Sequence, residues 1–131
     1  ITLHQEAYDS IEELKEKLNF IKRKNAKPSV AIRPKTPLSA IKDYLDVVDM
    51  ILIMTVDPGM AGQKFMPEPV AKVKELRKLK PNLDIEVDGG INPYTARAAL
   101  DAGANIFVAG SFVFGKKDRV LAIKEILGAL K

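Results

Sequence analysis

A glycine loop follows an acidic strand end in Glu86-Val87-Asp88-Gly89-Gly90-Ile91. Apolar residues alternate with acidic ones before Asp88, and this pattern predicts a strand over residues 84–88. Gly89 and Gly90 have no Cβ, so their backbone N–H groups can approach an anion closely. We therefore expect Asp88 to be a carboxylate on a rigid strand end beside an anion pocket. An ordinary Asp-Gly turn explains the same six residues equally well.

Five apolar segments alternate with five amphipathic ones along the rest of the chain. Strands are predicted at residues 1–4, 29–33, 50–55, 84–88 and 106–109. Helix starts are predicted by capping or proline residues at Ser10 with Glu13, Thr36 with Pro37, Pro67 with Pro69, Asn92 with Pro93, and Asp118, and a helix end is predicted by Gly103. Repeated alternation of strand and helix implies right-handed crossovers and a parallel sheet of the α/β class.

Glycine-bearing loops follow three consecutive predicted strands. The first loop reads Val56-Asp57-Pro58-Gly59-Met60-Ala61-Gly62-Gln63, the second contains Gly89 and Gly90, and the third begins at Gly110-Ser111. The carboxyl ends of parallel strands meet at one edge of the sheet, so these loops are expected to lie together. The last two occupy the position where (β/α)8 barrels commonly bind phosphate. The sequence therefore predicts a phosphate site at this edge.

Composition limits the class of protein and of ligand. With 131 residues, 47% of them hydrophobic, the chain fits a single domain over residues 1–131. The formal charge of +4 is scattered along predicted helix faces, which indicates solvated surfaces and no nucleic-acid partner, while favouring an anionic small molecule. The absence of cysteine makes a reducing cytoplasm the natural compartment, and no apolar run reaches the length of a membrane span. The start at Ile1, without an initiator methionine, suggests a fragment or a trimmed chain.

Other chemistries find little support. The glycine spacing fits neither a dinucleotide fingerprint nor a P-loop, and His4 is the only histidine, so no catalytic relay or multi-histidine metal site can be assembled. We expect His4 to be hydrogen-bonded near its strand end. Met50 and Met54 share one strand face, where core packing is the default and Met54 is placed to wall a pocket. Glu6 and Asp57 are interpreted as structural polar partners.

Three segments together, residues 54–65, 85–91 and 107–111, closely resemble the ribulose-phosphate 3-epimerase family. Residues 1–7 and 31–37 look like the fourth and fifth strand regions of that family, so the resemblance spans essentially the whole chain. It implies a (β/α)8 TIM barrel, of which this chain would form a partial barrel of five parallel βα units, strands 4 to 8. The Asp-x-Lys-x-x-Asp signature of related sugar-phosphate barrels is not found here.

The family interconverts ribulose 5-phosphate and xylulose 5-phosphate by moving the C3 proton through an enediolate, assisted by one divalent metal ion (Zn, Fe, Mn or Co). The resemblance implies that Asp88 is one of two catalytic aspartates and also a metal ligand. It further assigns the binding of the sugar and its phosphate to Met54, Gly59, Met60, Ala61, Gly62, Gly89, Gly90, Gly110 and Ser111. It also implies a cytoplasmic enzyme of the pentose phosphate pathway, and a homo-oligomer in the full-length protein.

Two departures from the family pattern matter. Ala61 stands where the family usually has glycine, which is reminiscent of the allulose-6-phosphate branch. The first three strands of the family, with the partner aspartate and two histidine ligands, have no counterpart, and His4 matches neither histidine. We therefore expect the remaining metal ligands to lie outside this chain and the isolated chain to be inactive or nearly so. The alternative is a non-catalytic phosphate-binding module, an open partial barrel with edge strands at residues 1–4 and 106–109.

Overall fold

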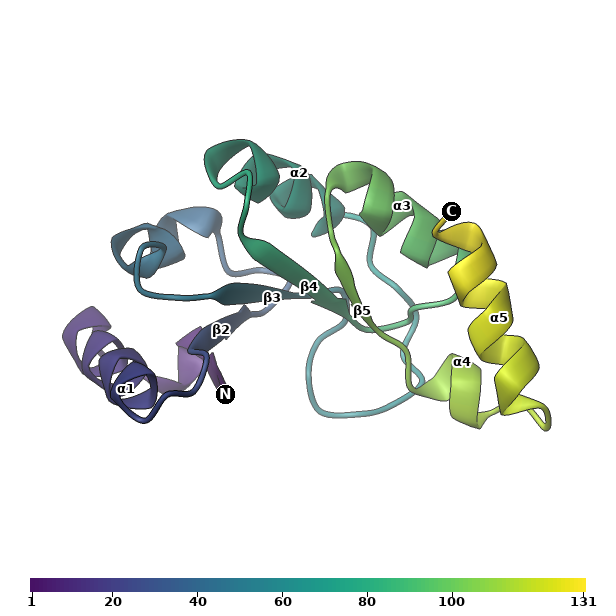
Figure 1. Cartoon of the computed structure of the whole chain (residues 1–131), viewed down its shortest axis with the longest axis horizontal. Helices are drawn as coiled ribbons and strands as arrows, with labels where there is room; N and C mark the ends of the chain where they lie inside the picture. Colours follow the sequence, from purple (N-terminus) through teal and green to yellow (C-terminus); the bar gives the residue numbers. More distant parts are fainter.

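Five parallel strands form one sheet in the computed structural model, which describes residues 1–131 (Figure 1). The strands lie in chain order across the sheet, so that each pairs only with its neighbours in sequence. Their bounds are β1 Thr2–His4, β2 Ser29–Ile32, β3 Met50–Met54, β4 Asp84–Asp88 and β5 Ile106–Val108. The predicted parallel sheet is confirmed, and each predicted strand agrees with the observed one to within a residue at each end. The two edge strands are β1 and β5, as expected for an open partial barrel.

Helices follow the sheet in an arc, in chain order from α1 through α2 and α3 to α5 (Figure 1). The helices are η1 Gln5–Ala7, α1 Ile11–Arg23, η2 Leu38–Tyr44, α2 Val70–Leu79, α3 Pro93–Ala102, α4 Ser111–Phe114 and α5 Arg119–Ala129, with η marking 3-10 helices. None of them combines the length and the apolar character that crossing a membrane would require.

The two faces of the sheet differ in character because side chains alternate along each strand. On the face that packs against the helices, alternate residues of three strands are fully buried and belong to the main hydrophobic core: Val30, Ile32, Ile51, Ile53, Ile85 and Val87. The opposite face carries Leu52, Glu86 and Asp88, which stay partly exposed. The helices therefore bury one face, and the other face is open to a ligand.

Most of the predicted helix boundaries are confirmed by capping contacts. The Ser10 hydroxyl accepts from the Glu13 backbone N–H at 3.1 Å, and Asn92 forms a reciprocal capping box with Thr95. Gly103 ends α3 in the left-handed region with φ of 111°, and the Asp118 carboxylate accepts from the Leu121 backbone N–H at the start of α5. These contacts satisfy backbone groups that a helix end leaves without partners.

The predicted cap at Thr36 was wrong. The segment that follows is the 3-10 helix η2, which begins at Leu38 without a side-chain cap. The Thr36 hydroxyl donates instead to the carboxylate of Glu6, thirty residues earlier in the chain. The Thr36 side chain is thus directed toward Glu6 and does not accept from the first N–H groups of η2.

The buried side chain of Thr55, just after β3, joins the ends of β3 and β4. Its hydroxyl lies 2.9 Å from the Asp88 carbonyl oxygen and 2.6 Å from the Gly89 carbonyl oxygen. Its backbone N–H donates to the same Asp88 carbonyl at 2.8 Å. Thr55 thereby fixes the main chain at Asp88 and Gly89, where β4 ends and its loop begins.

Gly89 and Gly90 allow the β4 loop to pack against the loop between β3 and α2. Both have positive φ, 122° at Gly89 and 63° at Gly90. A Cβ on Gly89 would lie 2.6 Å from Val56 Cγ2, and a Cβ on Gly90 would lie 2.7 Å from the Phe65 backbone nitrogen. The two glycines are therefore required by a backbone conformation and by a close approach between two loops.

The Gly90→Ala variant should lose about 2 to 4 kcal/mol of unfolding free energy, because the new methyl group meets the Phe65 backbone in a conformation that disfavours a side chain. Urea denaturation followed by circular dichroism measures this loss. The matched control is Gly128→Ala in α5, where nothing lies within 4 Å of the added Cβ. That variant should gain up to about 1 kcal/mol. Equal stability of the two variants would contradict the packing argument.

The Thr55→Val variant, which preserves shape, should lose about 1 to 3 kcal/mol, because the Gly89 carbonyl loses its hydroxyl partner in a buried position. The same substitution at the exposed Thr2 should change stability by less than about 0.5 kcal/mol. Thermal unfolding of both variants provides the comparison, and an equally small effect at Thr55 would remove its assigned role.

Candidate functional site

A cavity of about 460 Å³ opens at the carboxyl edge of the sheet. Its walls come from the ends of β1, β3, β4 and β5 and from the loops that follow the last three of these strands. The structure brings all ten predicted site residues into this one cavity: Met54, Gly59, Met60, Ala61, Gly62, Asp88, Gly89, Gly90, Gly110 and Ser111. Their roles in binding and catalysis remain predictions.

Asp88 ends β4, with Met54 of β3 and Val108 of β5 as its neighbours in the sheet. Its carboxylate forms no ion pair with another side chain. Burial raises the pKa of Asp88 above its ordinary value of 3.8, and a hydrogen bond from the Gly89 backbone opposes this effect only in part. Burial, together with the negative charge of Asp88, also raises the pKa of Glu86. The cavity therefore holds a carboxylate whose proton affinity is increased, as acid–base chemistry requires.

Met54 is almost completely buried and forms part of the cavity wall. Both expectations for Met54, burial and a place in a pocket wall, are confirmed, whereas Met50 is only partly buried and lies outside the main hydrophobic core. Strand alternation places both on the face opposite the helix-packed residues, with Met50 only partly buried. Two apolar faces cannot be told apart from the sequence of a strand that is apolar throughout.

Gln63 closes the loop after β3 upon itself, a role that the sequence analysis did not predict. Its side-chain amide donates to the Asp57 carbonyl at 2.6 Å and to the Met60 carbonyl at 2.9 Å. A lone amide side chain at the end of a glycine-rich loop was the only signal available. The exposed Asp57 carboxylate does not line the cavity and has no side-chain partner, so only the backbone of Asp57 takes part in the structure of the loop.

Ala61 fits this loop without backbone strain. The loop needs positive φ only at Gly59, with 140°, and at Gly62, with 77°. Asn25 is the one residue other than glycine with positive φ, so Ala61 has a backbone conformation that any residue adopts. The departure from the family pattern at this position therefore adds a methyl group to the cavity wall at a position that does not require positive φ.

Ser111 begins the short helix α4, which the sequence analysis did not predict, and Gly110 precedes it as the capping residue. The first N–H groups of a helix have no partners within the helix. Gly110 and Ser111 thus add a helix start to the two glycine loops after β3 and β4. Residues from three glycine-bearing loops thus line one cavity.

His4 also lines the cavity, from the end of β1. In place of the expected regular hydrogen bond, the buried Nδ1 atom makes a longer polar contact, with Oε2 of Glu6 at 3.5 Å. Glu6 itself is structural, as predicted. Its carboxylate accepts from the Arg33 backbone N–H at 2.8 Å and from the Thr36 hydroxyl.

The residues of this chain do not make a metal site by themselves. No three histidine, cysteine, aspartate or glutamate side chains gather closely enough to hold an ion. Within the cavity, Asp88 and His4 are the only side chains of these types. Structural and catalytic metal sites normally use about three or four protein ligands. The predicted metal therefore requires ligands from outside residues 1–131.

The fold is shared with solved structures of sugar-phosphate and nucleotide enzymes. 3-Hexulose-6-phosphate synthase from Salmonella typhimurium aligns with a TM-score of 0.74 at 18% identity, covering 98% of this chain and 60% of that one. Orotidine 5'-monophosphate decarboxylase from Sulfolobus solfataricus aligns with a TM-score of 0.68 at 14% identity, covering 98% and 60%. These similarities confirm the predicted TIM-barrel class.

Sequence comparison gives a narrower assignment. The chain is 47% identical over 130 residues to the chloroplastic ribulose-5-phosphate-3-epimerase of Arabidopsis thaliana, covering 96% of this chain and 46% of the relative. It is 44% identical over 117 residues to ribulose-phosphate 3-epimerase of Bacillus subtilis, covering 86% and 54%. The chain thus spans about half the length of these curated relatives. The model of the Ribulose-phosphate 3 epimerase family matches residues 1–114, and the chain belongs to this family.

Proposed function

We propose that the cavity serves the 3-epimerisation of a ketose phosphate, the interconversion of ribulose 5-phosphate and xylulose 5-phosphate. One observation carries the proposal: in a chain of this family, the carboxylate of Asp88 and the three glycine-bearing loops line a single cavity. Neither feature alone would suffice, because an Asp-Gly turn or a glycine loop is common in parallel sheets.

The phosphate group is assigned to the loops after β3, β4 and β5. Backbone N–H groups of glycine-rich loops and of a helix start form concave sites for anions. The cavity lining contains no lysine or arginine, so these backbone groups would carry the recognition of the phosphate. The rest of the sugar would then extend along the open face of the sheet.

Asp88 is assigned the proton transfer at C3. The C3 proton lies beside the C2 carbonyl, so its removal gives an enediolate, and return of a proton from the opposite side inverts the centre. Such an inversion needs one acid–base group on each side of the sugar. Asp88 supplies one of them, with a pKa raised by burial toward the working pH. The second group would come from outside this chain.

A divalent metal ion (Zn, Fe, Mn or Co) belongs to the same proposal, with Asp88 as one ligand and the other ligands outside residues 1–131. We also propose that the full-length protein is a homo-oligomer. Its proposed location is the cytoplasm, and its proposed pathway is the pentose phosphate pathway. A six-carbon ketose phosphate, allulose 6-phosphate, is the alternative substrate that Ala61 suggests.

A non-catalytic phosphate-binding module is the second candidate. The observation that favours it is the donor set of the chain, which offers one acid–base carboxylate and no metal site of its own. This candidate and the epimerase differ in whether Asp88 matters once the missing half of the barrel is supplied.

A chimera tests the epimerase proposal. This chain replaces the matching half of the Bacillus subtilis relative, which supplies the remaining strands. With Zn²⁺, Mn²⁺, Fe²⁺ or Co²⁺ present, we expect ribulose 5-phosphate turnover that falls about 10²- to 10⁴-fold in the Asp88→Asn variant. The 131-residue chain alone should show little or no turnover.

The matched control in the chimera is Asp57→Asn, which changes an exposed aspartate outside the cavity and should retain turnover. A folded chimera without activity in any of the four metals would overturn the epimerase proposal. Robust activity of the isolated chain that depends on Asp88 would instead overturn the expectation that the chain is incomplete.

Stability should depend on pH through Asp88. Its folded-state pKa lies above the ordinary value of 3.8, so the folded state binds this proton more tightly than the unfolded state does. The resulting contribution to stability is complete below pH 3.8 and is lost as the pH rises through the folded-state pKa. In chelator-treated buffer at pH 7, Asp88→Asn should therefore unfold at a higher temperature than the wild type. The difference should shrink below pH 4, and the opposite trend would contradict the assigned pKa direction.

A further inference from the structure

His4 is a second titratable side chain in the cavity to which the proposed function gives no role. His4 and Asp88 are the only titratable residues of the cavity lining. They end β1 and β4, the first and fourth strands of the sheet, so they lie on different sides of the cavity. A ligand that reaches from the glycine loops across Asp88 would extend toward His4.

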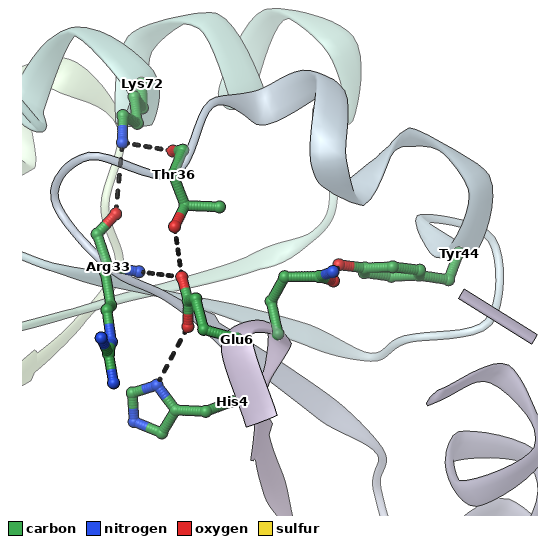
Figure 2. A network of polar contacts seen from close by, with 7 residues as sticks. His4, Glu6, Arg33, Thr36, Tyr44 and Lys72 are labelled. Atoms are coloured by element: carbon green, nitrogen blue, oxygen red, sulfur yellow. Dashed lines mark hydrogen bonds and ion pairs between the residues drawn. The ribbon is translucent and has the colours of Figure 1, made fainter. Parts of the chain in front are cut away.

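The imidazole of His4 presents one edge to the protein and the other to the cavity. Figure 2 shows the ring with its Nδ1 atom turned toward Glu6. This atom is buried and lies 3.5 Å from Oε2 of Glu6, whereas 40% of the side chain as a whole is exposed. The exposed part is therefore the opposite edge of the ring, which carries Nε2. Because His4 lines the cavity, this edge is available to a ligand.

Glu6 is held firmly in its place beside His4. One of its oxygens accepts from the Arg33 backbone N–H at 2.8 Å and from the Thr36 hydroxyl. The amine of Lys72, on α2, fixes the same loop by donating to the carbonyls of Arg33, at 3.3 Å, and Thr36 (Figure 2). It also donates to the Pro34 carbonyl at 2.6 Å. The loop over residues 33–36 thus anchors the carboxylate, and Lys72 on α2 holds that loop in place.

Glu6 also determines which nitrogen of the His4 ring is protonated. Burial alone would raise the pKa of Glu6, but hydrogen bonds from Arg33 and Thr36 outweigh it and lower the pKa, so the group stays ionised. A carboxylate opposite Nδ1 favours the proton on that atom. A neutral His4 then offers Nε2 as a hydrogen-bond acceptor.

On the basis of the proposed function, we infer that His4 is a substrate-binding residue that accepts a hydrogen bond from the unphosphorylated end of the ketose phosphate, and that Glu6 is its positioning residue. The phosphate is assigned to the loops after β3, β4 and β5, and His4 ends β1 at the other edge of the sheet. In a ketose 5-phosphate the group most distant from the phosphate is the C1 hydroxyl. A hydroxyl is the donor that a bare Nε2 atom binds.

The test is the binding of D-ribulose 5-phosphate and of inorganic phosphate to the 131-residue chain, measured by calorimetry. His4→Phe retains a ring and removes both nitrogens. It should weaken the binding of ribulose 5-phosphate about 3- to 10-fold, the value of one hydrogen bond, and leave the binding of inorganic phosphate unchanged. Ser111→Asp is the matched control. A carboxylate beside the glycine loops repels phosphate, so this variant should weaken the binding of both ligands.

Imidazole nitrogen chemical shifts provide a readout that does not depend on the stability of a variant. In the wild type near pH 8, His4 should be protonated on Nδ1, and ribulose 5-phosphate should shift its Nε2 signal whereas inorganic phosphate should not. The Glu6→Gln variant should move the proton toward Nε2. It should weaken the binding of ribulose 5-phosphate and leave the binding of inorganic phosphate unchanged.

The outcomes separate this inference from the proposed function. If both ligands bind and His4→Phe affects neither, or affects both equally, the inference is overturned and the phosphate site stands. If the wild type binds neither ligand, the proposed site fails and the inference fails with it. Selective loss of ribulose 5-phosphate, together with the Nε2 shift, supports the assigned contact.

Discussion

The parallel pairing of β3 with β4 is the constraint on which the cavity depends. Its register places Met54 beside Asp88, and the Thr55 backbone and hydroxyl continue the pairing past the end of the strands. A slip of one residue would turn Asp88 toward the helices and bring Val87 into the cavity. The glycine loops are positioned by the same register, because they begin where these strands end. One set of main-chain hydrogen bonds thus sets the positions of Asp88, of Met54 and of the glycine loops that follow β3 and β4.

Asp88, the carboxylate of the proposed site, reduces the stability of the fold. Asp88 is partly buried without a charged partner, and burial raises its pKa. Gly90 has a backbone conformation that other residues rarely adopt. The hydrophobic core lies on the other face of the sheet, where residues such as Ile53 and Val87 are fully buried. This separation allows the open face to carry a partly buried carboxylate and a backbone conformation that glycine adopts readily.

Local patterns in the sequence predicted the elements of the fold, whereas contacts between distant segments escaped prediction. The strands and the cap at Asn92 follow from periodicity and from residues within a few positions of each other. Thr36 was assigned wrongly because its partner, Glu6, is thirty residues away and no local signal marks it. The orientation of His4 toward Glu6 and the packing of Gly90 on Phe65 likewise depend on tertiary structure. The site residues were named through a family resemblance, and only the structure placed them in one cavity.

The consecutive order of the strands has a consequence for how such a chain folds. Each strand pairs with the strand before it in sequence, so no pairing has to wait for a remote segment to arrive. Each pairing is parallel, however, and has to close a whole crossover segment, which makes it slower to form than the contacts within a helix. A sheet of this kind grows by one strand and one helix at a time, in the manner of a repeat protein, and each unit contacts mainly its neighbours. A change within one unit should therefore disturb mainly that unit and the units on either side of it.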